Sequence, residues 1–572
     1  MICLTSPGVF REALGLGLAL GSMPPTFIQP ALDDDTVLDL EDVHVQRSGD
    51  MWLLMAEHTG SWCLLTDAEA MVAGHARNCH LGYLLGMYPM LGPARLRHFL
   101  TQLFQRGLLR LNGQAGLDPD LLSQGALFSE GNLVEILVTQ KCNLACRYCL
   151  AEAGPDMPHA RPHAAYLAVD EAFSLANDVP LLIQLSGGEP FVNFRLFKSL
   201  VEYIEQKRKE TTRRVHICTQ SNGALITDRI ASFLKEHNVD IGVSIDGPSE
   251  VNNLTRPLLA GGASHEKTMR GIRVLQRHGI AVGVIVVLSR ANVGHAAEIA
   301  DFLVAQDVHH VKINPVDLIG DAQRNWHSLA ITSDEYFAFV EAFVDHLIEA
   351  GLELAESNLA AYIEHLIFRT RKSRCLRSNC GAGKSFFLID AKGDVYPCAH
   401  SANLPKWRLG TIEEAKGDLI GLGSKNPIVR QFSERLVDRL PDTRTCPWRH
   451  LCEGGCAVNA YQHYGGILAA DSLCSFYERL YPRLLERLAM EPASFQRLLD
   501  LTFGAGHAEV ISLDLGIDEA IGSPAPSKPV VQDLLRRGAP SVASYHVSNG
   551  SGRSITYLNM PKVRDEKCQT LA

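Results

Sequence analysis

Short apolar runs of strand length alternate with helix-like segments along the middle of the chain, from residue 134 to about residue 315. Such alternation is typical of a parallel sheet built from strand–helix units, so the pattern predicts an α/β domain. The expected strands are Leu133–Val138, Leu181–Leu185, Val215–Thr219, Asp240–Ser244, Ala281–Leu288 and His310–Ile313.

A smaller domain is predicted ahead of this sheet, at residues 36–125. Its signals are strand-like runs at Val43–Val45 and Met51–Met55, a capping box at Thr66 and Glu69, and a helix at Ala94–Arg106 between Pro93 and Gly107. The last helix has an apolar face made of Leu96, Phe99, Leu100, Leu103 and Phe104. One interpretation is a purely structural cap whose apolar helix face packs on the α/β domain.

The remaining segments have weaker signals. Residues 1–35 are expected to be an irregular leader, residues 334–373 a helical bridge, and residues 374–490 a cysteine-rich domain. Beyond about Asp500 the periodicity is lost, and stretches rich in Gly, Ser and Pro predict loops or a loosely ordered extension over residues 491–572. At ~100–200 residues for each domain, several domains are expected.

The charge balance argues against a general affinity for nucleic acid. The chain has 54 Lys and Arg against 64 Asp and Glu, a formal net charge of −10, whereas phosphate backbones attract basic surfaces. The count leaves a local basic patch open. The apolar stretch Ala13–Leu20 is much shorter than the roughly 20 residues that span a bilayer, and no clear cleavage site accompanies it. A cytoplasmic protein without a membrane or nucleic-acid partner is expected.

The 15 cysteines are clustered, with three between residues 142 and 149 and seven between residues 375 and 474. Clustering in a long chain is typical of metal ligation in a reducing compartment. The first group, Cys142, Cys146 and Cys149, begins where the first expected strand ends. Iron–sulfur clusters usually take four thiolates, so three in one loop leave one iron free to bind something else. The alternatives are an incomplete zinc site or incidental cysteines, although zinc sites favour paired C-x2-C motifs.

This loop resembles that of radical S-adenosylmethionine (AdoMet) enzymes, in which the open iron binds the methionyl amine and carboxylate. Tyr148, just before the third cysteine, also fits the family pattern. The resemblance implies a partial (β/α)6 barrel with AdoMet and a [4Fe–4S] cluster as cofactors. It also implies reductive cleavage of AdoMet to methionine and a 5′-deoxyadenosyl radical, with the protein orienting the cofactors and excluding water.

Several residues at strand ends resemble the AdoMet pocket of the same family. The motif that holds the methionyl amino group is matched by Gly187, Gly188, Glu189 and Pro190. In it, the Glu189 carboxylate accepts a hydrogen bond from the ammonium. Positions similar to those around the ribose and methionine are Asn222, Ser244 and Asp246, and relatives often carry an Arg at the place of Arg256. The alternative for these residues is that they stabilise their own loops.

The second cysteine group resembles the SPASM domain of peptide-modifying radical enzymes. That resemblance implies one auxiliary [4Fe–4S] cluster on Cys375, Cys380, Cys398 and Cys456, and a second on Cys446, Cys452 and Cys474. The family has a further cysteine where this chain has Thr443, so the second cluster lacks a ligand. It is expected to have an open iron, to use another group or to be absent, which leaves one or two auxiliary clusters. A zinc ribbon is the alternative for the whole group.

Two further features bear on the substrate. Sulfatase-maturing relatives carry an Asp directly after the cysteine at the place of Cys398, where this chain has Ala399 and then His400. This departure disfavours a formylglycine-forming activity and leaves His400 as the candidate catalytic base. Residues 36–125 are similar in order and length to the winged-helix-like domains that present a sheet edge to a leader peptide in such enzymes.

The resemblance therefore implies a radical enzyme that installs a thioether or carbon–carbon crosslink in a ribosomally synthesised peptide. Its expected partners are a peptide or protein substrate with a leader, and an electron donor such as flavodoxin or ferredoxin. The alternatives are a sulfatase-type maturase, a peptide epimerase and a non-catalytic iron–sulfur module. An epimerase needs a thiol hydrogen donor that is not committed to a cluster, for which Cys218 is a candidate, although its strand context is typical of core. The intact cysteine loop and AdoMet motif argue against a non-catalytic module.

Overall fold

In the computed structural model the chain forms two compact units. Unit 1 comprises Met1–Ala126, Leu366–Thr370 and Tyr481–Ala572, and unit 2 comprises Leu127–His365 and Arg371–Leu480. The structure describes residues 1–5, 30–116, 131–175, 179–368, 380–402, 404–505, 509–512, 516–521, 528–537, 545–548 and 554–557.

Unit 2 is built on a 10-stranded sheet in the order β15-β14-β13-β12-β11-β10-β9-β16-β17-β18. Its first six strands along the chain are β9 (Asn132–Thr139), β10 (Leu181–Gly187), β11 (Val215–Ser221), β12 (Asp240–Ser244), β13 (Gly283–Leu288) and β14 (His310–Pro315). These six are parallel neighbours in sequence order. The predicted parallel α/β sheet is therefore confirmed, and every expected strand is present.

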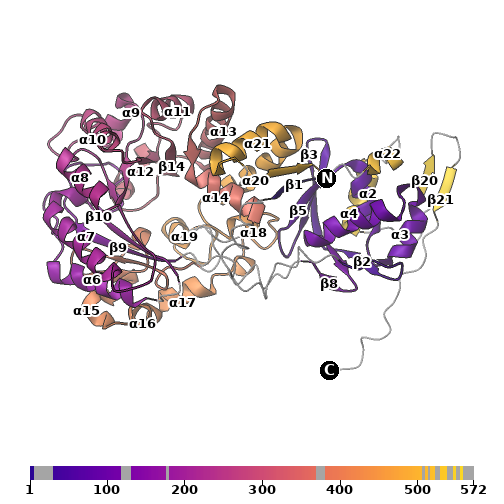
Figure 1. Ribbon diagram of the computed structural model, residues 1–572, viewed down its shortest axis with the longest axis horizontal. Coiled ribbons are helices and arrows are strands. Elements are labelled where there is room, and N and C mark those ends of the chain that lie inside the picture. The colour runs from indigo at the N-terminus through magenta and orange to yellow at the C-terminus, as the bar shows by residue number, and fades with distance from the viewer. Residues whose placement is uncertain are drawn as a thin grey trace. The chain divides into compact units, whose positions relative to one another are not determined.

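Helices follow the strands of this sheet and flank it (Figure 1). They are α6 (Pro162–Ser174), α7 (Phe194–Arg208), α8 (Asp228–Glu236), α9 (Ser249–Thr255), α10 (His265–Arg277), α11 (Ala296–Ala305), α12 (Asp321–Leu329), α13 (Ser333–Ala350) and α14 (Ser357–Phe368). Along β10, Leu181, Ile183 and Leu185 are fully buried. Because side chains alternate across a strand, Gln184 lies on the opposite face, where polar groups gather.

The sheet continues beyond these six strands on both sides. The segment predicted to be a helical bridge also contributes β15 (Ala355–Glu356), which pairs in parallel with β14. The cysteine-rich region contributes β16 (Phe386–Ile389), β17 (Asp394–Tyr396) and β18 (Gly410–Thr411). Strand β16 pairs in parallel with β9, and β17 and β18 follow antiparallel. Backbone hydrogen bonds thus join the cysteine-rich region to the first strand of the α/β domain.

Short helices complete the cysteine-rich region. They are α15 (Ile412–Ala415), α16 (Leu419–Ser424), α17 (Pro427–Glu434), α18 (Arg449–Cys452), α19 (Ala457–Tyr464) and the longer α20 (Cys474–Met490). An apolar cluster containing Trp407 and Phe432 forms their core.

Unit 1 contains a 5-stranded sheet in the order β19-β1-β5-β4-β3 and a 4-stranded sheet in the order β6-β2-β7-β8. Its N-terminal elements are β1 (Ile2–Thr5), β2 (Val37–Leu40), β3 (Val43–Ser48), β4 (Met51–Ala56), β5 (Trp62–Leu65), α2 (Asp67–His75), β6 (Cys79–His80), α3 (Leu81–Met87), α4 (Pro93–Gln105), β7 (Leu109–Leu111) and β8 (Gln114–Ala115). The predicted capping box is confirmed, because Thr66 Oγ1 accepts from Glu69 N (3.2 Å) and Glu69 Oε2 accepts from Thr66 N (3.0 Å).

The predicted apolar face of α4 is buried within unit 1 itself. Leu96, Phe99, Leu100 and Leu103 are fully buried and Phe104 nearly so, all in one core with residues of β2–β5 and α2. The interpretation of α4 as a cap that packs on the α/β domain is therefore wrong. Its apolar residues hold its own small domain together.

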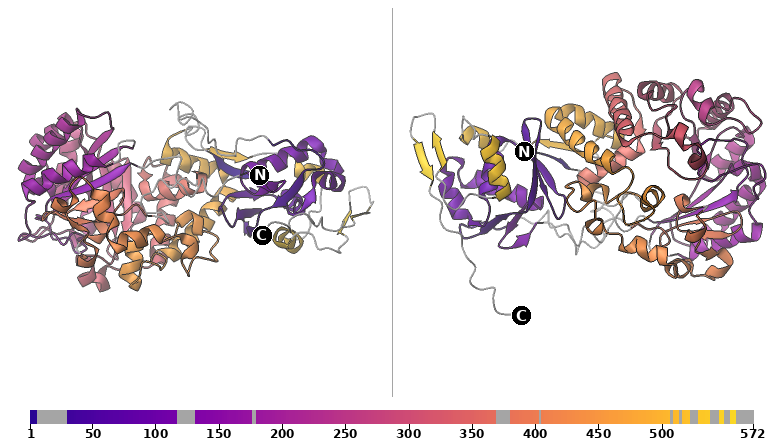
Figure 2. Two further views of the ribbon diagram at one scale, coloured as in Figure 1. Left: turned by 90° about the horizontal axis from the view of Figure 1, so that it is seen from below. Right: turned by 180° about the vertical axis from the view of Figure 1, so that it is seen from behind.

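The C-terminal part of the chain also belongs to unit 1. Its elements are α21 (Pro492–Phe503), β19 (Glu509–Ser512), α22 (Ile517–Ile521), α23 (Lys528–Arg537), β20 (Tyr545–Ser548) and β21 (Ser554–Tyr557). Helix α23 packs against α2 and β3 (Figure 2), and its Val531, Leu534 and Leu535 are buried in the core of unit 1. Among described residues, the loosely ordered extension is therefore a wrong expectation for 528–537. The Gly522–Ser527 stretch lies outside the described residues.

The expected irregular leader also needs correction, since β1 pairs antiparallel with β19 and β5.

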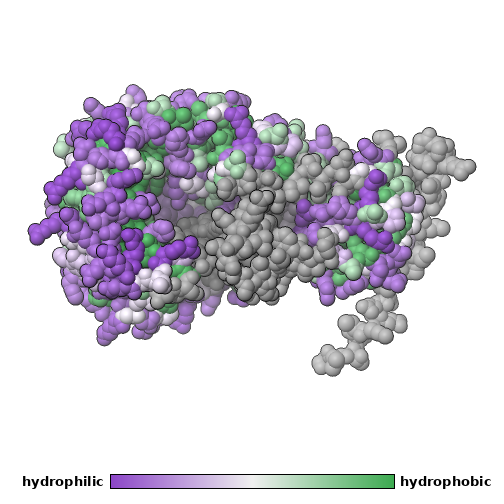
Figure 3. Space-filling view, viewed as in Figure 1, coloured by the Kyte–Doolittle hydropathy of each residue, from purple (hydrophilic) through white to green (hydrophobic). Residues whose placement is uncertain are grey.

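Hydrophilic residues predominate on the face shown in Figure 3. No helix in the described ranges is long and apolar enough to cross a membrane.

Candidate functional site

The loop that carries Cys142, Cys146 and Cys149 follows β9 and is anchored by backbone hydrogen bonds. Ala145 N donates to Pro257 O (2.9 Å), and Arg147 N donates to Thr255 O (2.9 Å). These bonds tie the cysteine loop to the segment after α9. The loop is therefore held from two strands of the sheet, β9 before it and β12 before α9.

The three thiols lie close enough to influence one another. Burial raises the pKa of Cys146 to about 12, and the thiols of Cys149 and Cys142 add to the rise. Backbone amides donate to the other two sulfurs, Leu144 N to Cys142 (3.4 Å) and Ala153 N to Cys149 (3.5 Å). Such hydrogen bonds to sulfur are a feature of iron–sulfur sites. Three neighbouring thiols, two of them with amide donors, fit a [4Fe–4S] cluster with one open iron.

Gly187 and Gly188 pack directly against the start of the cysteine loop. A Cβ atom on Gly187 would lie 2.1 Å from Thr139 O, and one on Gly188 would lie 2.5 Å from Lys141 O. Gly188 N donates to Thr139 O (2.9 Å) and Glu189 N to Lys141 O (2.9 Å). These glycines thus allow a close approach to the backbone at the start of the cysteine loop. It brings Glu189 beside that loop, with Pro190 opening the short helix behind it.

Glu189 is fully buried, and its carboxylate is held by donors at the end of β11. Ser221 Oγ donates to Oε1 (2.9 Å), and Asn222 N donates to Oε2 (2.8 Å). Burial raises the pKa of Glu189 to about 7. Within the described part of the chain, no Lys, Arg or His lies within 4 Å of it. A buried carboxylate without a cation fits a site for an ammonium group.

Asn222 and Ser244 are placed at neighbouring strand ends. Asn222 Nδ2 donates to Asn143 Oδ1 (2.8 Å) and lies 3.7 Å from Cys142 Sγ. Ser244 Oγ accepts from Gln220 Nε2 (2.9 Å). Asn222 therefore lies between Glu189 and the cysteine loop, whereas Ser244 is one strand farther along the sheet.

Asp246 is committed to other groups of the protein. Its carboxylate accepts from Tyr148 Oη, Thr255 Oγ1 (2.6 Å) and Val287 N (3.1 Å). Arg256 Nη1 donates to Tyr148 Oη (2.7 Å) and lies 3.8 Å from Asp246 Oδ1. This buried network fixes the cysteine loop through the side chain next to Cys149. The sequence marks these residues individually, but no sequence signal links them.

The structure also brings together three cysteines of the second group. Cys380, Cys398 and Cys456 belong to one apolar cluster, with Cys398 at the end of β17 and Cys456 at the start of α19. Burial raises the pKa of Cys398, and the neighbouring thiols of Cys380 and Cys456 add to the rise. These residues are termed triad A below. Cys375, the expected fourth ligand, lies outside the described residues.

A further set, triad B, consists of Cys446, Cys452 and Cys474. Burial raises the pKa of Cys452, and the other two thiols of the triad contribute. Thr443 is buried beside it, and its hydroxyl is directed at backbone carbonyls, those of Val437 (2.6 Å) and Leu440 (3.2 Å).

The carboxylate of Glu478, one helical turn after Cys474, raises the pKa of both Cys446 and Cys474 in addition to the larger effect of burial. Among the described residues, no group of three or more His, Cys, Asp or Glu side chains is arranged to hold a single metal ion.

Acid–base groups gather beside triad A. His400 Nε2 lies 3.8 Å from Asp317 Oδ2, and His400 Nδ1 is buried with no hydrogen-bond partner among described residues. On the inner face of β9, Glu135 is buried and accepts from Ser186 Oγ (2.5 Å). Burial raises the pKa of Glu135, while nearby His400 acts in the opposite direction. The sequence singled out His400 but missed Asp317 and Glu135, which belong to no motif.

Comparison with known proteins agrees with this geometry. Residues 136–303 match the radical SAM superfamily. The chain is 23% identical over 359 residues to the cysteine-type anaerobic sulfatase-maturating enzyme of Clostridium perfringens, which covers 60% of this chain and 94% of that enzyme. It is 25% identical over 370 residues to the serine-type enzyme of Bacteroides thetaiotaomicron, covering 59% of this chain and 86% of that enzyme.

The fold is likewise similar to a solved structure, native anSMEcpe with bound AdoMet. The TM-score is 0.54 at 22% identity, over 62% of this chain and 99% of that one. Residues 136–303, which hold the cysteine loop and Glu189, thus match the radical SAM superfamily, whose cofactors are AdoMet and a [4Fe–4S] cluster.

Proposed function

We propose that the protein is a radical AdoMet maturase that oxidises a ribosomally synthesised peptide and leaves a thioether or carbon–carbon crosslink. The observation that carries this proposal is that unit 2 holds the cysteine loop, Glu189 and both cysteine triads. Strands β16 and β17 connect triad A to the sheet that carries the cysteine loop. A maturase needs both a radical source and an acceptor for the electron that remains, and this arrangement offers sites for both.

Each residue of the radical site has a defined task in this proposal. Cys142, Cys146 and Cys149 hold the cluster, and the Glu189 carboxylate accepts the ammonium of AdoMet. Tyr148 and Asp246 keep the cysteine loop in place. When bound, the cluster and AdoMet supply the 5′-deoxyadenosyl radical that removes a hydrogen atom from the peptide.

Oxidation of the peptide by two electrons requires more than hydrogen abstraction. The peptide radical must also lose one electron and one proton before or as the new bond forms. Triad A, completed by Cys375, would hold a [4Fe–4S] cluster as the electron acceptor. His400 is the proposed proton acceptor, with Asp317 orienting its ring and stabilising its charged form.

The same proposal assigns peptide docking to the edge of β3 in unit 1. This strand pairs only with β4 among the described strands. Glu57 N donates to Asp42 O (2.8 Å), which fixes the alternation of hydrogen bonds along the pair. Backbone groups of Val43 and Val45 therefore point away from β4, towards the free edge. An extended peptide can add to such an edge as a further strand.

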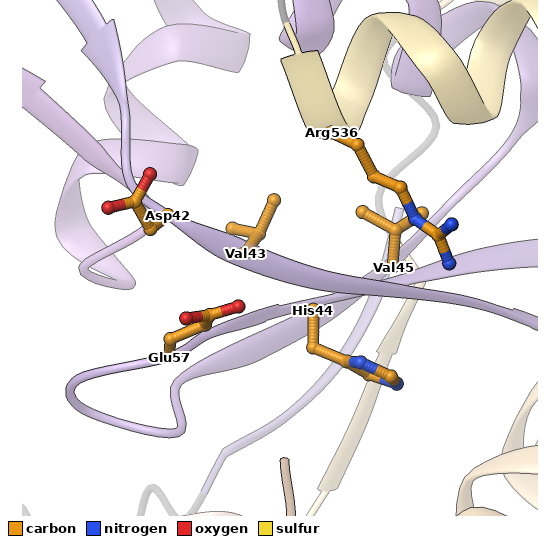
Figure 4. Close-up of a pocket in the computed structure, with 6 residues that line it drawn as sticks. All are labelled: Asp42, Val43, His44, Val45, Glu57 and Arg536. Carbon is orange, nitrogen blue, oxygen red and sulfur yellow. The ribbon is translucent and has the colours of Figure 1, made fainter. Parts of the chain in front are cut away.

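A cavity of 380 Å³ lies beside this edge (Figure 4), and its lining residues are Asp42, Val43, His44, Val45, Glu57 and Arg536. Asp42 and Glu57 offer negative charge, while Arg536, from α23, offers positive charge. The cavity thus supplies side-chain contacts of both signs next to the backbone groups of β3. Such contacts would give selectivity to a docked leader peptide.

Sulfatase-type maturation is the second candidate, because the relatives named above are sulfatase-maturating enzymes. Ala399 argues against it, since those relatives are expected to carry an Asp there. The two candidates differ in product. Formylglycine formation creates an aldehyde, whereas a crosslink removes two hydrogen atoms and leaves no aldehyde.

The test starts with the reduced, cluster-loaded protein and AdoMet, for which we expect 5′-deoxyadenosine. A candidate peptide is then added with reduced flavodoxin or ferredoxin, and the product is analysed by mass spectrometry and with an aldehyde-reactive probe. Loss of two hydrogen atoms without probe labelling is expected. Probe labelling would favour sulfatase-type maturation, and absence of 5′-deoxyadenosine would contradict both.

A further inference from the structure

Arg435 is a buried cation whose donors all go to backbone carbonyls. Its side chain is among the largest fully buried ones, with 1% of the residue exposed. Nε donates to Ile467 O (2.7 Å), Nη1 to Gly455 O (3.0 Å), and Nη2 to Gly454 O (2.7 Å) and Ala469 O (3.0 Å). Within the described ranges, no carboxylate lies within 4 Å of the guanidinium. The hydrogen bonds are satisfied, but the charge is not paired.

The position of this cation is defined by the cysteines around it. Gly454 and Gly455 lie between Cys452 of triad B and Cys456 of triad A. The guanidinium therefore holds the short loop that connects the two triads. Burial lowers the pKa of Arg435. Four nearby acidic groups raise it: the side chains of Cys456, Asp471, Cys380 and Cys452.

Asp471 is the carboxylate in this neighbourhood, and its role is local. Its Oδ2 accepts from Cys456 N (2.7 Å) and its Oδ1 accepts from Leu473 N (3.2 Å). Burial raises the pKa of Asp471. A buried charge without a close counter-ion is unfavourable. We therefore expect an anion near Arg435 that the polypeptide itself does not provide.

We propose that Arg435 is a positioning residue whose charge offsets that of anionic iron–sulfur clusters on triads A and B, and raises their reduction potential. The inference rests on the proposed use of these triads as cluster ligands. A [4Fe–4S] cluster bound by thiolates is negatively charged overall, and reduction adds one more negative charge. A fixed cation beside it favours the reduced form. Arg435 would thereby make the cluster a better acceptor for the electron from the peptide radical.

The test measures the auxiliary clusters without peptide or turnover. Full-length protein carrying Cys142→Ala, Cys146→Ala and Cys149→Ala lacks the ligands of the first cluster, so redox titration followed by electron paramagnetic resonance reports the remaining ones. In this background Arg435→Gln removes the positive charge. Arg435→Lys keeps the charge but loses the planar set of guanidinium N–H donors. Arg408→Gln is the control, because it removes an equal charge from an exposed arginine that pairs with Asp394 (2.6 Å).

We expect Arg435→Gln to lower the equilibrium constant for cluster reduction at least tenfold, which is about 59 mV for a one-electron couple. Arg435→Lys and Arg408→Gln should remain close to the background protein. Equal potentials in the background and the Gln variant, at equal iron content, would overturn the inference and leave the proposed function intact. A background protein without any auxiliary cluster would overturn both.

Iron content covers the case in which Arg435→Gln fails to assemble. If the Gln variant loses the auxiliary clusters and the Lys variant keeps them, charge is the property that matters, as proposed. If both variants lose them equally, the hydrogen bonds to the Gly454–Gly455 loop explain the residue, and the role of charge is refuted.

Discussion

Glu189 shows how burial prepares a single side chain for its ligand. The residue is fully buried, accepts hydrogen bonds from Ser221 and Asn222, and has no cation within 4 Å among the described groups. Because burial raises the pKa of Glu189 to about 7, its carboxyl is partly protonated at neutral pH, and an ammonium bound there would displace that proton. The carboxylate is thus unfavourable alone and favourable with an ammonium, which couples AdoMet binding to pH.

This coupling predicts a pH-dependent stability for protein free of AdoMet. The pKa of Glu189 is raised from 4.5 to about 7 in the folded state. The folded state therefore binds the proton more tightly, and the resulting stability is lost as pH rises through about 7. The full effect is on the order of 3 kcal/mol. We expect the thermal midpoint to fall between about pH 4.5 and about pH 7, the two pKa values of Glu189, and to fall less in Glu189→Gln. The same slope in both proteins would contradict this account.

The cysteine loop gives a second residue-scale prediction. Replacing any one of Cys142, Cys146 and Cys149 with Ala removes a ligand from a cluster that has only three. Each variant should form no 5′-deoxyadenosine above background in an anaerobic assay with dithionite and AdoMet. Wild-type rates in any one would disprove the assignment.

Cys218→Ala is the matched control for that experiment. Cys218 lies on β11, where its sulfur is 3.9 Å from Gln184 Oε1, and it belongs to none of the three cysteine sets. Formation of 5′-deoxyadenosine should be unchanged in this variant. A crosslinked product from Cys218→Ala would also argue against the epimerase alternative, which needs this thiol.

His400 carries the third prediction. His400→Gln removes the proposed proton acceptor but not the radical site, and general bases typically contribute 10²–10⁴-fold. Peptide oxidation should therefore slow by about 10²-fold or more, while 5′-deoxyadenosine forms at the wild-type rate. If His400 were only structural, its replacement should lower iron content or 5′-deoxyadenosine formation as well.

At the scale of elements, the edge of β3 can be tested without disturbing its pairing with β4. Val45 points its backbone N–H to the free side of the strand, so Val45→Pro removes one edge donor and no β3–β4 hydrogen bond. One hydrogen bond is worth about 0.5–1.5 kcal/mol, so peptide affinity should fall by roughly 2–10-fold by calorimetric titration. Unchanged affinity would exclude this edge as the docking site.

The control for this substitution is Gln46→Pro. Gln46 pairs with Leu53 and directs its N–H at β4, so the change breaks the sheet itself. It should lower the stability of unit 1 by more than Val45→Pro does, because Val45→Pro loses core contacts of a buried side chain but no β3–β4 hydrogen bond. Truncation is less informative. Deleting residues 1–111 would expose Val531, Leu534 and Leu535 of α23, which are buried against the removed elements.

Local signals in the sequence identified individual helices and strands reliably. They did not reveal which distant segments pack or pair with one another. The capping box at Thr66 and the strand Asp240–Ser244 agree with the structure because each depends on a few adjacent residues. The return of α23 to unit 1 could not be predicted, since its partners α2 and β3 lie more than 450 residues earlier in the chain and its own pattern is short. For the same reason β15 and β16 were not foreseen as extensions of the sheet.

The candidate site divides in the same way. Motif spacing marked all three cysteines of the loop and Glu189, which the structure brings together. It did not reveal the contacts of Tyr148 with Asp246 and Arg256, nor the burial of Arg435, because these depend on segments that meet only after folding. The proximity of residues within one motif was predictable, and the contacts that support them were not.

For the whole molecule, iron content tests how many clusters the protein holds. A [4Fe–4S] cluster on the loop and another on triad A give about eight irons for each chain, and a third on triad B gives about twelve. Cys380→Ala and Cys398→Ala should each lower the content by about four, with 5′-deoxyadenosine formation retained. Iron of about four per chain that neither change reduces would contradict an auxiliary cluster. Zinc in its place would support the ribbon alternative.

The division of unit 1 between the two ends of the chain has a consequence for biosynthesis. Unit 2 is complete once residue 480 has left the ribosome, but unit 1 still lacks α23 until about residue 537. Chains grow at about 5–20 residues per second and domains fold as units. The radical domain can therefore fold and take up iron while the edge of β3 still lacks the helix that packs beside it. A nascent chain would acquire its reactive centre before its means of selecting a substrate.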